Sequence, residues 1–143
     1  MHPAAPGTLS RRLAALCYDG LVLTALLASF TLAIVALRGG RAIGGGTLWF
    51  EAALLAVVLL FFCWFWTHGG QTVGMRAWRI RVISEDGGSV RWGAAVVRFA
   101  AAILSVLPLG LGFWWSVLDA RGRCWHDRLS RTRVVLETRA RAS

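Results

Sequence analysis

The sequence predicts an all-α membrane protein with two full transmembrane helices, a third hydrophobic region broken by proline and glycine, and a small pair of β-strands at the cytoplasmic surface. Three observations lead to this fold class. The chain of 143 residues is 57% hydrophobic and 16% charged, whereas soluble domains carry about 25% charged residues. Its apolar residues gather in runs long enough to cross a bilayer. Its sixteen basic residues are all arginine and lie mostly outside those runs.

The first two apolar runs cover residues 13–37 and 47–66, and about 20 residues suffice to cross the hydrocarbon core. The first run is too long for the apolar part of a signal peptide, and no A-x-A-like cleavage site follows it. The short glycine-rich connection RGGRAIGGG separates the runs, so we expect an antiparallel hairpin. Trp49, Trp64 and Trp66 lie near the ends of the second run, where tryptophan rings favour the membrane interface.

The third apolar region, residues 92–118, contains Pro108, Gly110 and Gly112 near its middle. Proline removes a backbone donor and breaks a helix, so this region is either one kinked span or a helical hairpin. The arginines favour the hairpin, because positive residues collect on the cytoplasmic side. Three full spans would leave seven C-terminal arginines outside, whereas a hairpin keeps both termini in the cytoplasm.

Two segments, RIRVI at 79–83 and RTRVVL at 131–136, have similar sequences and β-branched ends. The turn sequence EDGG follows the first, and we expect the two segments to pair as strands under the helices. GGQTVG at 69–74 lacks the Gly-Lys-Ser/Thr ending of a phosphate loop, so we interpret it as a flexible turn. The expected organisation is an N-terminal tail (1–10), one membrane domain (11–136) and a C-terminal tail (137–143).

Asp19 lies two turns into the first apolar helix, where an ionised carboxylate is costly. Arg12 shares a helix face with it, about 10 Å away along the axis, and is expected to snorkel to the headgroups. Asp19 therefore needs a partner on another segment, and Arg98 lies at a similar depth if both helices enter from the cytoplasm. This pair is either a structural ion pair that orients the helices or a proton- or ion-linked site.

Metal and catalytic sites are not expected. The three cysteines lack paired spacing, and CWHD at 124–127 offers too few donors for zinc, so we expect no metal, no cofactor and no disulfide. His126 precedes Asp127 but has no convincing nucleophile nearby, so the protein is not expected to be an enzyme. Asp127 is expected to act as a structural clasp that accepts hydrogen bonds from backbone amides or a nearby arginine.

Three blocks of the sequence together resemble the RDD family of membrane proteins, named for one arginine and two aspartates. RRLAALCYDG contains Arg12 and Asp19, and GGQTVGMRAWRIRVISEDGG is followed by VVRFAA with Arg98. LDARGRCWHDRLSRTRVV contains Asp127. The resemblance covers about residues 11–136. Met75-Arg76 stands where the family usually shows a lysine after the central Gly-x-x-x-Gly.

The resemblance implies a small multi-pass protein of the bacterial inner membrane, in a family whose general activity is not established and for which transport has been proposed. The site residues it implies are Arg12, Asp19, Arg98 and Asp127, supported by His126, Thr132, Gly70 and Gly74. We expect transport of an ion or small ligand through an intramembrane Asp/Arg site; the alternative is a non-transporting module that assembles or anchors partners.

The expected partner is the lipid bilayer, with anionic headgroups at the arginine-rich face. A chain this short encloses little volume, so transport would need a homo-oligomer. Nucleic-acid binding is not expected, because the arginines do not belong to a separate soluble fold.

Overall fold

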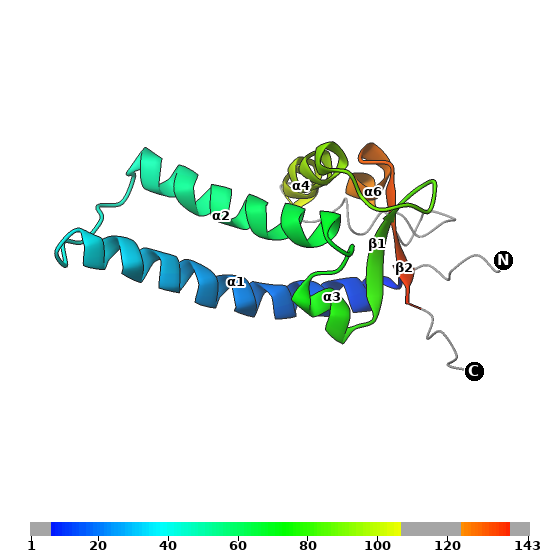
Figure 1. The fold of residues 1–143 in the computed structure, drawn as a ribbon, viewed down its shortest axis with the longest axis horizontal. Coiled ribbons are helices and arrows are strands. Elements are labelled where there is room, and N and C mark those ends of the chain that lie inside the picture. Colours follow the sequence, from blue (N-terminus) through cyan, green and yellow to red (C-terminus); the bar gives the residue numbers. More distant parts are fainter. Residues whose placement is uncertain (1–6, 107–123, 138–143) are drawn as a thin grey trace.

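A computed structural model describes residues 7–106 and 124–137 of the chain (Figure 1). Two long helices form a hairpin that extends to one side, and the remaining elements gather at the other end as a cap. In chain order the elements are α1 (Leu9–Leu37), α2 (Leu48–Thr67), α3 (Val73–Ala77), β1 (Ile80–Ser84), α4 (Trp92–Val106), α6 (Trp125–Leu129) and β2 (Thr132–Leu136).

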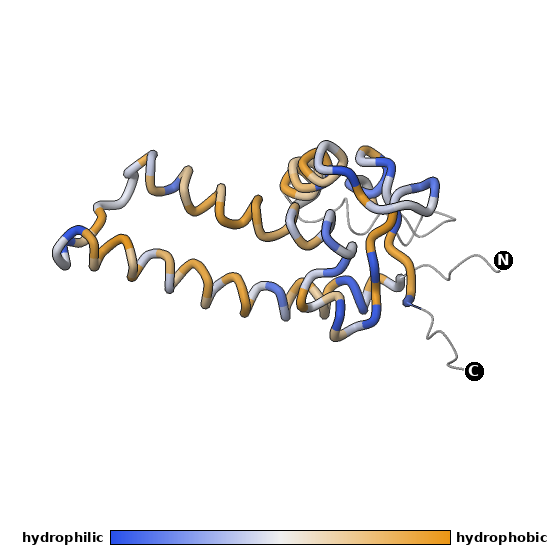
Figure 2. Tube along the Cα trace, in the orientation of Figure 1, coloured by the Kyte–Doolittle hydropathy of each residue, from blue (hydrophilic) through white to orange (hydrophobic). Residues whose placement is uncertain are grey.

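The hairpin of α1 and α2 confirms the two expected apolar helices, whose ends lie within a few residues of the predicted ones. Both helices are long and apolar enough to cross a membrane. The rest of the described chain buries 0% of the most apolar stretch of α1 and 6% of that of α2. Figure 2 shows hydrophobic residues along nearly the whole hairpin, whereas hydrophilic residues concentrate in the cap. This exposed apolar surface suits a bilayer, since soluble monomers rarely expose patches of this size.

The expected strand pair is also confirmed. β1 and β2 are antiparallel, with Val82 opposite Val134 and Ser84 opposite Thr132. Both valines are almost completely buried. The backbone N–H of Gly7 donates to the carbonyl of Val134 at 3.0 Å. The start of α1 and the last described strand therefore lie at the same end of the molecule.

The interpretation of GGQTVG as a flexible turn is wrong, because part of it forms α3. Thr72 caps this helix, since its Oγ1 accepts from the backbone N–H of Met75 at 3.2 Å. Gly70 has a φ of +72°, and a Cβ there would lie 2.3 Å from the carbonyl oxygen of Val82. The Gly70 carbonyl instead accepts from the Val82 N–H at 2.7 Å. Only glycine allows this close approach between the segment before α3 and β1.

The cap contains an internal repeat with an offset of 52 residues. A five-residue helix, an arginine with positive φ and a five-residue strand occur in that order twice, as α3–β1 and α6–β2. The two arginines are Arg79 (φ 53°) and Arg131 (φ 50°). Val82 and Val134, which face each other in the sheet, occupy equivalent positions of the repeat. The strand pair therefore has local two-fold symmetry about these two valines.

Each unit of the repeat packs against one apolar helix. α1 packs against α3, and α4 packs against α6. α1 contains Arg-Leu-Ala-Ala from Arg12, and α4 contains Arg-Phe-Ala-Ala from Arg98. The two stretches are similar, but both arginines bind Asp127 of α6, and neither binds α3.

The third hydrophobic region is described only in its first part, α4, which begins at Trp92, where the predicted region begins. Pro108, Gly110 and Gly112 lie outside the described residues. Asp127 lies beside Arg98, which is in the middle of α4.

We predict from this arrangement that both termini lie in the cytoplasm. A reporter fused after Arg141 should give a cytoplasmic signal, because β2 lies beside the start of α1 and arginine-rich segments stay inside. A fusion after Gly44, in the connection between α1 and α2, should give an external signal. A fusion after Arg12 serves as the cytoplasmic reference, and an external signal after Arg141 would contradict the prediction.

Candidate functional site

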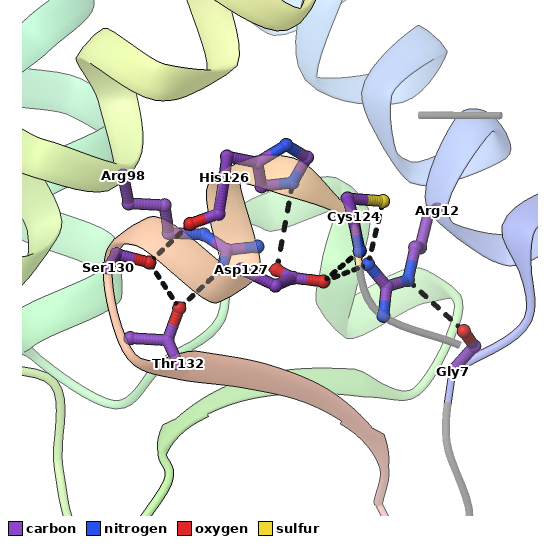
Figure 3. Close-up of polar contacts among 8 residues, drawn as sticks. All are labelled: Gly7, Arg12, Arg98, Cys124, His126, Asp127, Ser130 and Thr132. Atoms are coloured by element: carbon purple, nitrogen blue, oxygen red, sulfur yellow. Dashed lines mark hydrogen bonds and ion pairs between the residues drawn. The ribbon is translucent and has the colours of Figure 1, made fainter. Parts of the chain in front are cut away.

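The centre of the candidate site is Asp127, whose carboxylate binds two arginines from different helices (Figure 3). Nη1 of Arg12 lies 2.5 Å from its Oδ2, and Nη1 of Arg98 lies 2.5 Å from its Oδ1. The backbone N–H of Cys124 also donates to Oδ2 at 3.1 Å. In this last bond Asp127, the third residue of α6, accepts from the backbone of the N-cap residue Cys124. Asp127, Arg12 and Arg98 are all buried, and the expectation that Asp127 acts as a clasp is confirmed.

A chain of hydroxyl groups supports Arg98. Its Nη1 also donates to Oγ1 of Thr132 at 2.6 Å. Ser130 donates to the carbonyl of His126 at 2.6 Å and lies 2.7 Å from the Thr132 hydroxyl. Because the one Ser130 proton is used, Thr132 donates to Ser130. Figure 3 shows these side chains beside the first turn of α6 and the start of β2.

Arg12 is fixed just as fully on the α1 side. Its Nε donates to the carbonyl of Gly7 at 3.1 Å, and its Nη1 donates to Sγ of Cys124 at 3.2 Å. The expectation that Arg12 snorkels to the headgroups is therefore wrong, since its side chain is buried. The carboxylate of Asp127 offers a stronger partner than water at the bilayer surface.

Asp19 joins α1 to the start of α3. Its Oδ1 accepts from the backbone N–H of Gly74 at 2.7 Å, and its Oδ2 accepts from the hydroxyl of Thr72. A Cβ at Gly74 would lie 2.1 Å from the carbonyl oxygen of Ala15, so a side chain there would separate the two helices. The expected ion pair between Asp19 and Arg98 is wrong. Arg98 binds Asp127 instead, and the donors of α3 satisfy Asp19.

Trp66 also differs from its expected place. Only 5% of its side chain is exposed, and the guanidinium of Arg98 lies 5.1 Å from the centre of its ring. A cation over an indole face is attracted by the ring quadrupole. Trp64 and Trp49 remain exposed, as interfacial rings would be.

The charges of α6 are set by burial and by the two arginines. Burial would raise the pKa of Asp127, but Arg98 and Arg12 outweigh it and hold that pKa well below its usual range. Burial, aided by Arg98, lowers the pKa of His126 to about 3. At neutral pH Asp127 is therefore ionised and His126 is neutral.

Three potential metal ligands lie together at the start of α6. The ligand atoms of Cys124, His126 and Asp127 lie within 4.8 Å of one another. Nη1 of Arg12 lies within hydrogen-bonding distance of both the sulfur and the carboxylate. A guanidinium thus occupies the place of a cation, and a divalent ion there would be repelled by Arg12 and Arg98.

A cavity of about 190 Å³ lies between the cluster and the helices of the hairpin. Asp19, Arg98, Arg12 and His126 contribute polar groups to its wall. The rest of the wall is mainly apolar and comes from α1, α2, α3, α4 and β2 (Ala15, Leu16, Phe62, Trp66, Met75, Phe99, Ala102, Ile103 and Val134). Asp19 and Arg98 therefore face one cavity although they do not pair.

All eight residues named from the sequence have a place in this arrangement. Five of them gather around α6 (Arg12, Arg98, His126, Asp127 and Thr132), and Asp19 with the two glycines Gly70 and Gly74 fixes α3. Sequence reasoning missed Thr72, Cys124, Ser130 and Trp66. Thr72 carried a recognisable signal, since a threonine before a short helix is a typical N-cap.

The fold and the site together define a small helical membrane protein, in which two apolar helices rise from a cap held by a buried Arg–Asp–Arg cluster. The family model of the RDD family matches residues 6–131, and the chain belongs to the RDD family. No curated protein and no solved structure matches it.

The hydrogen bonds predict which charged residues are coupled in their contributions to the free energy of unfolding. Asp127→Asn and Arg98→Gln should each lower the free energy of unfolding in detergent by about 3–5 kcal/mol, because each leaves a buried charge without its partner. The double variant should lose clearly less than the sum. Asp19→Asn combined with Arg98→Gln should lie closer to additivity. Arg38→Gln, at an exposed arginine, is the control, and stronger coupling of Arg98 to Asp19 than to Asp127 would refute this assignment.

The low pKa of His126 predicts a loss of stability in mild acid. An unfolded histidine takes up a proton near pH 6.5, but the folded one resists protonation down to about 3. Its stabilising contribution is complete above pH 6.5 and falls by about 1.4 kcal/mol per pH unit below it. The melting temperature should drop between pH 7 and 4.5, and His126→Gln should flatten that slope. His68→Gln, at an exposed histidine, should retain it; an unchanged slope in His126→Gln would contradict the prediction.

Proposed function

We propose that this protein takes part in transport of an ion or small ligand across the bacterial inner membrane, with the cavity beside Asp19 and Arg98 as the ligand site. One observation carries the proposal: a carboxylate and a guanidinium on two apolar helices face the same cavity. Ionisable groups that face the interior of a membrane protein commonly mark ion or substrate pathways. Ligand sites are typically apolar cavities with a few convergent polar groups.

The internal repeat supports the same proposal. Many transporters are built from structural repeats, with the substrate site at the interface between them. In this chain the cavity wall includes Met75 of the first repeat unit and Val134 of the second, besides Arg12 and Arg98. The proposed site thus lies where the halves meet.

Asp19 is the residue best suited to bind a transported cation or proton. Among the described residues it accepts hydrogen bonds from Gly74 and Thr72, which use about half of the lone-pair sites of a carboxylate. Asp127, in contrast, accepts from both arginines and from the Cys124 N–H. We therefore assign the binding role to Asp19 and the structural role to Asp127.

The exposed arginines of the cap and the number of membrane-length helices also bear on the proposal. Exposed arginines lie over the cap (Arg76, Arg79, Arg91, Arg128 and Arg131), where they suit the anionic headgroups of the cytoplasmic leaflet. One chain offers two membrane-length helices among its described residues. Transport is therefore assigned to a homo-oligomer.

A second function is favoured by the cluster itself. Arg12, Asp127 and Arg98 satisfy one another, as expected for a non-transporting module whose buried ion pairs only orient helices before partners assemble on them. The two functions differ in one measurable respect, since only a transporter moves a solute in a purified bilayer.

Flux through proteoliposomes tests the proposal. Purified protein should raise the flux of at least one cation, scanned with and without a pH gradient. Asp19→Asn should lower that flux about tenfold or more, since losing about 1.4 kcal/mol of binding at the site suffices for a factor of ten. Glu51→Gln, which changes an exposed carboxylate on α2 outside the cavity, should retain the flux. Absence of flux would favour the non-transporting module, whereas full flux in Asp19→Asn would refute the binding role of Asp19.

A further inference from the structure

The helix α4 lies crosswise at the base of the apolar hairpin. Figure 1 shows α4 nearly end-on, whereas α1 and α2 run across the view. The first residue of α4 lies beside the end of α2, since the ring centres of Trp92 and His68 are 6.2 Å apart. Near its other end, Ile103 lines the same cavity as Leu16 of α1. α4 therefore runs from the end of α2 toward α1, and does not continue parallel to the two long helices.

The length of α4 also separates it from the helices of the hairpin. Its 15 residues measure about 22 Å at 1.5 Å per residue, whereas the hydrocarbon core is about 30 Å thick. Its apolar stretch is Trp92–Leu104, and apolar stretches of about 10–14 residues are more often buried, interfacial or re-entrant than spanning. Among the described residues, only α1 and α2 have the length of a membrane span.

One face of α4 is apolar and is left uncovered by the described residues. Trp92, Val96, Ala100 and Leu104 follow at intervals of four along this face, and all are exposed. Residues four apart lie on one side of a helix. Val96 is 45% exposed and Leu104 is 60% exposed. Since this face is uncovered, α4 is not a buried core helix.

The opposite face of α4 is held by the protein. Ala95 and Phe99 belong to the hydrophobic core, and the ring of Phe99 lies 6.1 Å from that of Phe62 on α2. Arg98 binds Asp127 of α6. Isolated helices at a membrane surface turn a charged face to water. In α4 the cap takes the place of water on that side, and the apolar face is directed outward.

The neighbours of α4 indicate the depth at which it lies. Trp64 and His68 stack at the end of α2, with ring centres 4.0 Å apart, and His68 also contacts Trp92. Tryptophan rings favour the level of the headgroups. The exposed Arg91 precedes Trp92 and suits anionic headgroups. The apolar surface of the hairpin therefore continues onto α4 at the level of the membrane interface.

We propose that α4 lies in the plane of the membrane at the cytoplasmic interface, with the face of Trp92, Val96, Ala100 and Leu104 inserted among the lipid chains of the inner leaflet. The partner of this surface is the lipid itself. This placement differs from the membrane-crossing leg expected from the sequence. Arg98 then stays near the interface and avoids the cost of a charge at the bilayer centre. The placement holds whether or not the protein transports a solute.

Spin labels on three successive turns of α4 test this placement. Val96→Cys, Ala100→Cys and Leu104→Cys are labelled one at a time, in the full chain in liposomes of phosphatidylethanolamine and phosphatidylglycerol. Collisions of the label with oxygen and with a water-soluble nickel complex give its depth. Four residues along a spanning helix change the depth by about 6 Å. We expect all three labels about 5–10 Å into the boundary between headgroups and acyl chains, with differences smaller than one such step.

α1 supplies a matched series with the same spacing. Leu13→Cys, the native Cys17 and Leu21→Cys place labels at exposed positions of a helix of membrane length. Their depth should increase by about 12 Å from the first to the last. All other variants also carry Cys17→Ala, and this change alone should leave the chain unlabelled, because Cys63 and Cys124 are buried. Circular dichroism and melting temperature confirm that each variant is folded.

A depth that increases by about 6 Å at each step along α4 would show a helix that crosses the bilayer and would overturn the inference. Two other results would also overturn it. Labels that collide with the nickel complex but little with oxygen would place this face of α4 in water. Dipolar broadening between labels on separate chains would show that a second copy, and not lipid, covers the face.

Discussion

The bridge from Arg12 through Asp127 to Arg98 is the interaction on which the rest of this structure depends. Each arginine comes from a different helix, and the aspartate sits in the first turn of α6 beside both. A buried carboxylate with a single arginine would already be neutralised, so the second arginine adds a net positive charge that burial makes costly. Hydrogen bonds from the two guanidiniums stabilise that charge; the acceptors are the hydroxyl of Thr132, the carbonyl of Gly7 and the sulfur of Cys124. The cap therefore closes only when α1, α4, α6 and β2 are all in place.

The same bridge shows how a symmetric scaffold carries asymmetric chemistry. Both arginines bind Asp127 of the second repeat unit, whereas the equivalent position of the first unit, 52 residues earlier, is Met75. One half supplies the carboxylate that both arginines need, and the other supplies a flexible apolar side chain to the cavity wall. The unit that lacks its own carboxylate is held by Asp19 of α1, which binds the start of α3. A two-fold arrangement thus yields one structural carboxylate and one beside the cavity.

Each kind of sequence signal predicts only the part of the fold or site that it measures. Length and apolar runs give spans, so α1, α2 and α4 were predictable to within a few residues, and similar sequences gave the strand pair. The position of Asp127 after the broken apolar region predicts a clasp. The partner of Asp19 was not predictable, because sequence gives the depth of a residue in the bilayer but not the direction in which its helix face points. α3 was missed because five residues show no helical period, and Trp66 was misplaced because an interfacial and a buried tryptophan have the same position in the sequence.

The distribution of polar groups along the hairpin limits how any solute crosses. Beyond Asp19, α1 runs for about 27 Å to Leu37 at 1.5 Å per residue. Two of its three hydroxyl residues along the way bond back to their own helix, Thr24 to the carbonyl of Gly20 and Ser29 to that of Ala25, each at 2.8 Å. They are therefore poorly placed to replace the water around an ion. α2 offers Glu51 near the far end, beside the connection between the helices. A charged solute bound at Asp19 thus meets an apolar stretch that the described residues of one chain do not bridge, so a crossing requires either further copies of the chain or a ligand that is itself apolar.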